Sequence, residues 1–262
     1  MKLGLGLGIN QRAENLESFA TFTDNFRLHF DGTNDSATVT NDVFKTFTGG
    51  GFSVSYWLQQ DAIGTGNSHF HWNIYPASGT AMRIFVATDS GGGGSHNGKY
   101  KFQITDANGG AEILRTNSAV ESTDLKHIVV TAQNSDKLRL FINGAEITAV
   151  GGTGVTGLDS DDLDGMTTTV LELGQNGNDS AFLDGKINDF AFFNKRLDAA
   201  NIAAIYNSGT AFDLTSNKGN YDSSSNLKAY YKMEEGSGTT VEDSSGNTGN
   251  LTLVNGTAFV AT

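Results

Sequence analysis

Apolar side chains alternate with polar ones through much of this chain, and this period of two limits the possible folds more than any other feature. In the clearest stretch, Phe52, Val54, Tyr56 and Leu58 alternate with serines and a tryptophan. Successive side chains of a β-strand point to opposite faces of its sheet, so the pattern predicts a strand with one buried face. Similar patterns predict strands at 26–30, 69–75, 82–88, 100–105, 127–133, 138–142, 169–173, 187–193, 227–234, 251–254 and 258–260.

Turn and helix signals separate these strands. Asn143-Gly144 can adopt the positive φ values of a type I′ turn, which predicts a hairpin over 138–147. One short helix is expected after Asp198, whose side chain can cap the first amides, with Gly209 as its left-handed stop. Many strands and one helix predict an all-β fold, a two-sheet antiparallel sandwich.

Composition agrees with a folded chain and narrows its partners. Only 18% of the 262 residues are charged, 10% are aromatic, and proline occurs once, which is the reverse of a disordered composition. The net charge of −12 argues against nucleic acid and anionic membrane surfaces, which need clustered Lys and Arg. No apolar run approaches the roughly 20 residues of a membrane helix, so no membrane insertion is expected. Cysteine is absent, so no disulfide supports the fold.

The first residues form a distinct pattern in which Leu3, Leu5, Leu7 and Ile9 alternate with glycine. The stretch is a poor signal peptide, because its apolar region is short and diluted by glycine. It predicts an extended arm over 1–20 that lies along another surface, with the four apolar residues as assembly contacts.

Four segments in order resemble the laminin-G-like, concanavalin-A-like jelly-roll family. They are LHFDGTND (28–35), FSVSYWL (52–58), KHIVVT (126–131) leading into LFING (140–144), and LDGKINDFAFFNKRL (183–197). In the family the last segment precedes a short helix, as expected here. The resemblance implies a jelly-roll sandwich over 21–211, and it implies little about function, because fold does not fix function.

One segment stands in an unusual place for this family. LKAYYKMEEGSGTTVEDSSGN (227–247) resembles a segment that many such domains carry at their start. Here it follows a polar stretch, 212–226, that is expected to be a linker. Strands within 227–262 either complete this sandwich in permuted order or pair with a neighbouring copy. The first alternative is favoured, because a single domain needs its own sheet edges covered.

Catalysis is not expected. Jelly-roll glucanases place their carboxylates in a Glu-x-Asp-x-x-Glu pattern on one strand, and this chain has no such run. Glu112, Glu121, Glu146 and Glu172 are isolated in sequence, so they are expected to be solvated surface groups. No Gly-x-Ser-x-Gly elbow is present either.

Calcium is the most plausible cofactor. Asp31, Asn34 and Asp35 occupy one turn, which can present several oxygens to a cation. In the family that the chain resembles, a structural cation often bridges an early turn and a late strand, which implies Asp189 as the partner and Asp184 as a reserve. The alternative is that these side chains hydrogen-bond their own turn without metal.

Glycan binding needs an exposed aromatic beside hydrogen-bonding groups. Trp72 and Tyr75, with His71 and Asn73, are the candidates, although strand alternation sends Trp72 to the face opposite His71 and Tyr75. A buried aromatic that fills the sandwich is the alternative. Loops at one end of the sandwich, 63–68 and 90–97, form a further ligand platform.

Three functions follow from these features. The leucine–glycine arm and the 227–247 segment resemble parts of bacteriophage tail or capsid-surface proteins, which implies a virion structural and attachment protein. Its partners would be other virion proteins, further copies of itself and cell-surface glycans. The second is a secreted, calcium-dependent carbohydrate-binding module on the bacterial surface. The third, a jelly-roll glycoside hydrolase or lyase, is weakened by the missing carboxylate pair.

Overall fold

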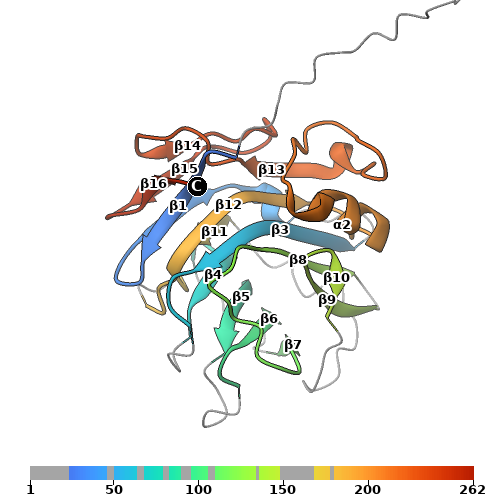
Figure 1. Ribbon diagram of the computed structural model, residues 1–262, viewed down its shortest axis with the longest axis horizontal. Coiled ribbons are helices and arrows are strands. Elements are labelled where there is room, and N and C mark those ends of the chain that lie inside the picture. Colours follow the sequence, from blue (N-terminus) through green and yellow to red (C-terminus); the bar gives the residue numbers. More distant parts are fainter. Residues whose placement is uncertain are drawn as a thin grey trace, which may run out of the picture.

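The protein is described here by a computed structural model that covers residues 24–45, 50–63, 68–78, 83–89, 96–105, 110–133, 136–147, 168–177 and 180–262. These residues form two antiparallel sheets packed face to face (Figure 1). The described chain has a single α-helix, α2 (Ala199–Tyr206). The predicted all-β sandwich with a short helix is therefore confirmed. The predicted assembly residues Leu3, Leu5, Leu7 and Ile9 lie outside the described residues.

Sheet A has eight strands, of which β1 and β13 both pair with β12. In pairing order its strands are β10 (Ala145–Glu146), β9 (Asp136–Ile142), β8 (Lys126–Gln133), β3 (Gly51–Gln60), β12 (Asp184–Phe193), β1 (Phe26–Asp31) and β16 (Ala258–Ala261), with β13 (Leu227–Tyr231) beside the second half of β12.

Sheet B also has eight strands. In pairing order they are β14 (Thr240–Val241), β15 (Leu251–Val254), β2 (Ser36–Thr40), β11 (Thr169–Leu173), β4 (Phe70–Pro76), β5 (Arg83–Asp89), β6 (Lys99–Thr105) and β7 (Ala111–Arg115).

The C-terminal strands pair with both sheets of their own chain. β16 pairs with β1 and β15 pairs with β2, while β13 pairs with the last residues of β12, beyond the N-terminal end of β1. The backbone amide of Thr262 donates to the carbonyl of Asn25 at 3.0 Å. The C-terminus therefore lies beside the first described residues, as Figure 1 shows.

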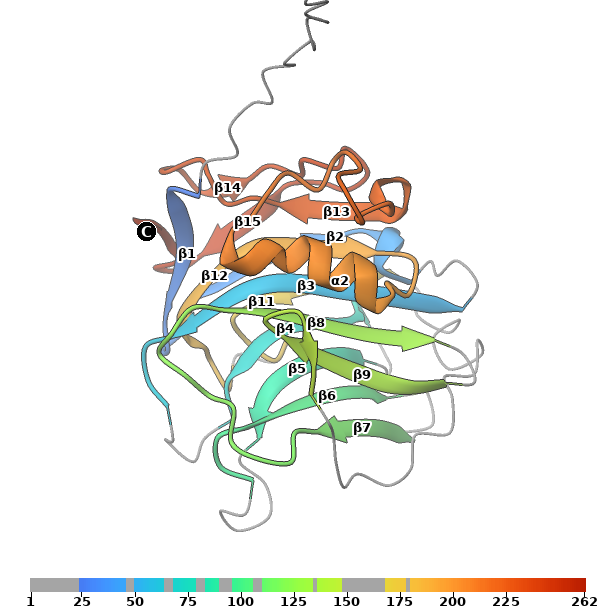
Figure 2. The same ribbon diagram turned by 45° about the vertical axis from the view of Figure 1, so that its right-hand side comes forward.

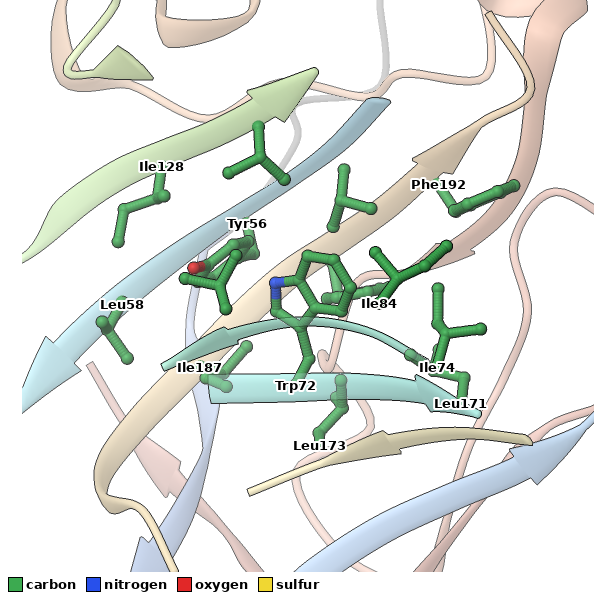
Figure 3. Close-up of a cluster of buried hydrophobic side chains, with 14 of the residues drawn as sticks. Tyr56, Leu58, Trp72, Ile74, Ile84, Ile128, Leu171, Leu173, Ile187 and Phe192 are labelled. Carbon is green, nitrogen blue, oxygen red and sulfur yellow. The ribbon is translucent and has the colours of Figure 1, made fainter. Parts of the chain in front are cut away.

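The main core lies between the sheets and is rich in aromatic side chains. Trp72 from β4 packs edge-on against Tyr56 from β3, with ring centroids 6.5 Å apart (Figure 3). Phe52 stacks on Phe192 at 6.1 Å. Full burial of each large apolar side chain contributes roughly 1.5–3 kcal/mol, so the alternation read from the sequence translates directly into stability.

A second apolar layer covers the outer face of sheet A. α2 lies across this face (Figure 2). Its residues Ile202 and Ile205 belong to one apolar cluster with Val129, Ala191 and Phe193 of the sheet. The Asp198 side chain accepts a 2.8 Å hydrogen bond from the amide of Asn201, which confirms the predicted cap.

Two expectations for the region around this helix are corrected. The helix ends at Asn207, whose φ of 45° is left-handed, and not at Gly209. The stretch 212–226 is not a solvated linker, because Phe212, Leu214 and Tyr221 are buried in the layer that covers sheet A. The Tyr221 hydroxyl donates to the Leu214 carbonyl at 2.8 Å and holds the stretch in a closed loop.

The sequence prediction missed some strands but identified one hairpin correctly. The strands β2, β7 and β14 were not predicted from the sequence. The hairpin between β9 and β10 is confirmed, with positive φ at both Asn143 (52°) and Gly144 (77°). Within the described residues, no helix has the length and apolar character needed to cross a bilayer.

Candidate functional site

A cleft of about 360 Å³ opens at one end of the sandwich. It is lined by Gly32, Ser68, His69, Ala181 and Phe182. These residues belong to the connections β1–β2, β3–β4 and β11–β12, which meet where β1 ends and β4 begins. Of the predicted loop platform at 63–68, Ser68 lines this cleft, and residues 64–67 lie outside the described residues. Of the second predicted loop, 90–97, only residues 96 and 97 are described.

Backbone hydrogen bonds fix the walls of the cleft. The amide of Gly32 donates to the Leu183 carbonyl at 2.9 Å, and the amide of Phe70 donates to the Ala181 carbonyl at 3.0 Å. Gly32 has a φ of 75°, and a Cβ there would lie 2.9 Å from the Cβ of Asp184. A side chain at this position is excluded by both conformation and space, so the close approach of the β1–β2 turn to β12 depends on glycine.

The electrostatics of the cleft favour a neutral histidine. Burial lowers the pKa of His69, and the nearby carboxylates of Glu121 and Asp184 only partly oppose this effect. A neutral imidazole presents one donor and one acceptor, and the Ser68 hydroxyl presents both. Phe182 also lines the cleft, so an aromatic residue lies beside these polar groups, and small-molecule sites combine polar and apolar groups in this way.

Charged residues from neighbouring strands lie beyond the cleft on sheet A. Asp61 forms an ion pair with Lys186, at 2.7 Å to one carboxylate oxygen, and the same carboxylate lies 3.2 Å from Nε2 of His29. These groups neutralise one another and leave little net charge at that position.

The turn that was predicted to bind calcium is held by its own hydrogen bonds. Asp31 accepts from the amide of Thr33 at 2.8 Å. Asp35 is 1% exposed and accepts from the amides of Asp31 at 3.1 Å and Gly256 at 2.7 Å. The Asn34 carbonyl accepts from the side chain of Asn255 at 2.6 Å. Asp35 thus joins the β1–β2 turn to the β15–β16 turn without requiring a cation.

Asp189 does not meet this turn, which corrects its predicted role. Asp31 pairs with Asp184 in the register of β1 and β12, so Asp189 lies five residues further along, about 16 Å at the rise of a strand. Its carboxylate accepts from the Tyr230 hydroxyl at 2.8 Å and from the Asn188 amide at 3.1 Å. Burial raises the pKa of Asp189 well above its usual value.

Calcium binding therefore stays a prediction with a smaller ligand set. Among the described residues, no group of three or more His, Asp or Glu side chains is arranged to hold a metal. The reserve residue, Asp184, is the carboxylate that lies opposite Asp31. Isothermal titration of an EDTA-treated sample tests the pair. Heat on calcium addition together with a raised melting temperature supports calcium binding, and the absence of both effects contradicts it.

The predicted glycan residues of β4 are divided by a β-bulge. The register of β4 against β5 shifts between Phe70 and Trp72, so His71 and Trp72 both point into the core. Trp72 is fully buried and offers no face to a sugar, which corrects its predicted role. Nδ1 of His71 lies 2.9 Å from the Tyr56 hydroxyl, and burial lowers the pKa of His71 to about 3.

The other two β4 residues, Asn73 and Tyr75, lie on the outer face of sheet B. The Tyr75 hydroxyl donates to Glu172 of β11 at 3.1 Å, and Gln175 donates to the same carboxylate at 2.5 Å. Glu172 is 5% exposed, so the expectation that it is a solvated surface group is wrong. Tyr75 is only half-buried, but Asn73 is buried beneath Gly177, so the pair does not form an open sugar platform.

One pair that sequence reasoning missed has the geometry of a nucleophile and its base. Oγ of Ser55 lies 2.8 Å from Nε2 of His127. Both residues are buried beneath α2, and Tyr206 of that helix stacks on the imidazole at 6.0 Å. Nδ1 of His127 has no hydrogen-bond partner among the described residues, so the orienting group of a triad is missing. The pair is a buried polar contact that no substrate can reach.

The fold and the position of the cleft define a lectin-like jelly-roll sandwich. Residues 31–203 match a family model, Laminin_G_3, described as the concanavalin A-like lectin/glucanases superfamily. The chain belongs to this family, and the resemblance seen in the four sequence segments is confirmed. No curated protein sequence matches the chain.

Solved structures share this fold at low sequence identity. A proposed carbohydrate-binding protein from Bacteroides ovatus superposes with a TM-score of 0.62 at 17% identity, over 90% of this chain and 60% of that one. The chain thus spans less than two-thirds of that protein. Domain 4 of AbnA, an extracellular arabinanase from Geobacillus stearothermophilus solved with arabinotriose, has a TM-score of 0.50 at 15% identity, over 69% and 76% of the two chains. The receptor-binding domain of botulinum neurotoxin D gives 0.50 at 18%, over 74% and 46%.

Proposed function

We propose that this chain is a non-catalytic carbohydrate-binding module that holds its glycan in the cleft between Gly32, Ser68, His69, Ala181 and Phe182. The observation that carries the proposal is the cleft itself, in which an aromatic wall stands beside a hydroxyl and a neutral imidazole. Sugars present hydroxyl groups, which can hydrogen-bond to the serine and histidine, and apolar ring faces, which can pack on the phenylalanine. Membership of a lectin and glucanase superfamily supports the same conclusion.

The non-catalytic part of the proposal depends on the carboxylates near the cleft. A glycosidase needs two carboxyl groups about 5–10 Å apart on either side of the scissile bond. Asp61 is paired with Lys186, and Asp35 is buried in backbone hydrogen bonds. Cleavage of a β-glucan by pure protein, above the level of a mock purification, contradicts this part.

A glycan array with the intact chain tests the binding, and two phenylalanine variants locate it. Phe182→Ala removes the aromatic wall of the cleft and is expected to weaken glycan binding about ten-fold. Phe259→Ala is the matched control, because Phe259 is a similarly half-buried ring on β16 that does not line the cleft. Equal losses in the two variants, or none in either, contradict the assignment of the cleft.

The setting that we propose for this module is the surface of a phage virion, as a decoration, fibre or adaptor protein among copies of itself and other virion proteins. The support is the resemblance of residues 1–9 and 227–247 to phage proteins. Deletion of residues 1–12 is expected to abolish incorporation into particles while the melting temperature stays nearly unchanged. Efficient incorporation of the deleted protein contradicts the proposed arm.

A secreted bacterial module is the second candidate, and the Bacteroides and Geobacillus structures favour it. The neighbouring genes distinguish the two settings, since capsid and tail genes support the virion and polysaccharide-degrading enzymes support the secreted module. Glycan binding by the cleft is common to both.

A further inference from the structure

Two cations share one aromatic ring on the outer face of sheet B. The guanidinium carbon of Arg83 lies 5.0 Å from the centroid of the Phe85 ring, and Nζ of Lys101 lies 5.1 Å from the same centroid. Arg83 and Phe85 are alternate residues of β5, and Lys101 comes from the adjacent strand β6. We call these three residues the basic track.

Neither cation of the basic track forms an ion pair among the described residues, although the chain carries twelve more acidic than basic groups. Their neighbour Arg115, which lies opposite Lys101 in the register of β6 and β7, pairs with Asp89. Burial lowers the pKa of both Arg83 and Lys101. For Lys101 the charge of Asp89 opposes this effect, and the charges of Arg115 and Arg83 add to it. A purely structural role would favour a carboxylate in direct contact with the two cations, because burial disfavours their charged forms.

The basic track is continuous with the cleft. Ala181, which lines the cleft, packs against an apolar cluster formed by Phe70, Phe85 and Ala87. Phe70 and Phe85 stack with their centroids 4.5 Å apart. The ring that carries both cations is therefore part of the wall that reaches the cleft, and a chain-like ligand in the cleft can extend along β5 and β6 over the track.

We propose that the glycan bound by this module is acidic and that Arg83 and Lys101 bind its carboxylates. The inference rests on the proposed carbohydrate-binding function and names the class of ligand. The planar guanidinium of Arg83 suits two parallel hydrogen bonds to a carboxylate, and the ammonium of Lys101 acts as a compact point charge. Both charges lie within about 10 Å of each other, because each is about 5 Å from the same centroid. Uronic-acid residues of one polysaccharide segment can engage both.

Paired polysaccharides that differ only in charge test the proposal on the full-length chain. Polygalacturonate and its fully methyl-esterified form share one backbone, and dextran sulfate with neutral dextran separates sulfate from carboxylate. We expect the chain to bind polygalacturonate, to bind the ester at least ten-fold more weakly, and to lose affinity for the acid at high salt. Arg83→Gln and Lys101→Gln are each expected to weaken binding to the acid about ten-fold.

Lys218→Gln is the matched control. Nζ of Lys218 lies 5.1 Å from the Phe212 centroid, so this variant removes the same charge from the same kind of contact, away from the basic track. We expect its affinity for polygalacturonate to stay within about two-fold of the parent chain. An equal loss in Lys218→Gln and Lys101→Gln overturns the proposal, because binding then depends only on total charge.

The other outcomes separate this inference from the proposed function. Equal binding of the acid and the ester, or binding that neither track variant changes, leaves a carbohydrate-binding module and overturns the acidic ligand. Preference for dextran sulfate over polygalacturonate overturns the carboxylate assignment. Binding of no glycan, neutral or acidic, overturns the proposed function and the inference together.

Discussion

The two outer faces of the sandwich are built differently. The outer face of sheet A is closed by α2 and the stretch 212–226, which bury Phe193 and Tyr230 completely (Figure 2). No α-helix in the described part of the chain covers the outer face of sheet B, where Arg83, Lys101 and Tyr75 are half-buried. We call them the closed face and the open face.

We infer from this difference that the closed face contributes mainly to stability and the open face mainly to ligand binding. On the closed face, apolar groups fill the space, and one of its cations, Lys232, is paired with Asp213 at 2.7 Å. On the open face, Arg83 and Lys101 keep their charges without a carboxylate partner among the described residues. We therefore expect substitutions on the closed face to change stability most, and substitutions on the open face to change binding most.

Truncation after Gly219 is expected to have the largest effect. It removes β13 from the closed face and removes β15 and β16, which cover the edges at β2 and β1. Exposed strand edges template aggregation, so the truncated chain should be insoluble. Solubility and circular dichroism measure this. A soluble, folded product contradicts closure within one chain and supports a strand donated by a neighbouring copy.

Single substitutions compare the two faces directly. Phe193→Ala empties a fully buried position on the closed face and is expected to cost about 3–5 kcal/mol of unfolding free energy. Tyr75→Ala on the open face removes a half-buried ring and its hydrogen bond to Glu172, at a cost of about 1–2 kcal/mol. Urea denaturation of both variants measures the difference. The comparison fails if the order of the two costs is reversed.

Lowering the pH is expected to reduce the stability of the closed face through protonation of His127. Burial lowers its pKa from 6.5 to about 3, so the folded chain keeps this imidazole neutral while the unfolded chain protonates it. The contribution of His127 to stability is therefore complete above pH 6.5 and falls by up to about 1.4 kcal/mol per pH unit as the pH drops toward 3.

His127→Gln is expected to be less stable than the parent at pH 7, because the ring packs on Trp57 at 4.9 Å, and to lose less stability between pH 6.5 and 4. His71 titrates in the same direction in both proteins and cancels in the comparison. Urea unfolding at several pH values measures the two slopes, and identical slopes contradict a buried neutral His127.

The sequence was sufficient for the fold because its signal is local. Strand alternation, the Asn143-Gly144 turn and the Asp198 cap each depend on neighbouring residues, and each is present in the structure. The stretch 212–226 was misjudged, because Tyr221 is surrounded by polar residues in sequence and buried only by α2 and sheet A. The signals that could have corrected this were the large apolar residues of the stretch, Phe212, Leu214 and Tyr221.

The site depended on long-range geometry and was predicted only in part. A bulge of one residue turned His71 into the core, and no pattern in 69–75 marks it. Asp189 was assigned to calcium by resemblance, but the register of β1 and β12 places it at the far end of the strand. Arg83 and Lys101 are 18 positions apart in sequence and meet over Phe85 only through the pairing of β5 and β6.

The smallest expected change in stability is also the sharpest test of the two faces. Burial lowers the pKa of Lys101, so its charged form is disfavoured in the folded chain at every pH below 10.5. Lys101→Met removes that penalty and should leave the unfolding free energy unchanged or raise it by up to about 1 kcal/mol, while binding to polygalacturonate falls. Lys232→Met is the control, because Lys232 also lies over a ring, 5.5 Å from the Tyr230 centroid, but is paired with Asp213. It should lose about 1 kcal/mol, since it leaves that carboxylate without its cation. If Lys101→Met destabilises the chain as much as Lys232→Met, both cations are structural and the open face has no special role in recognition.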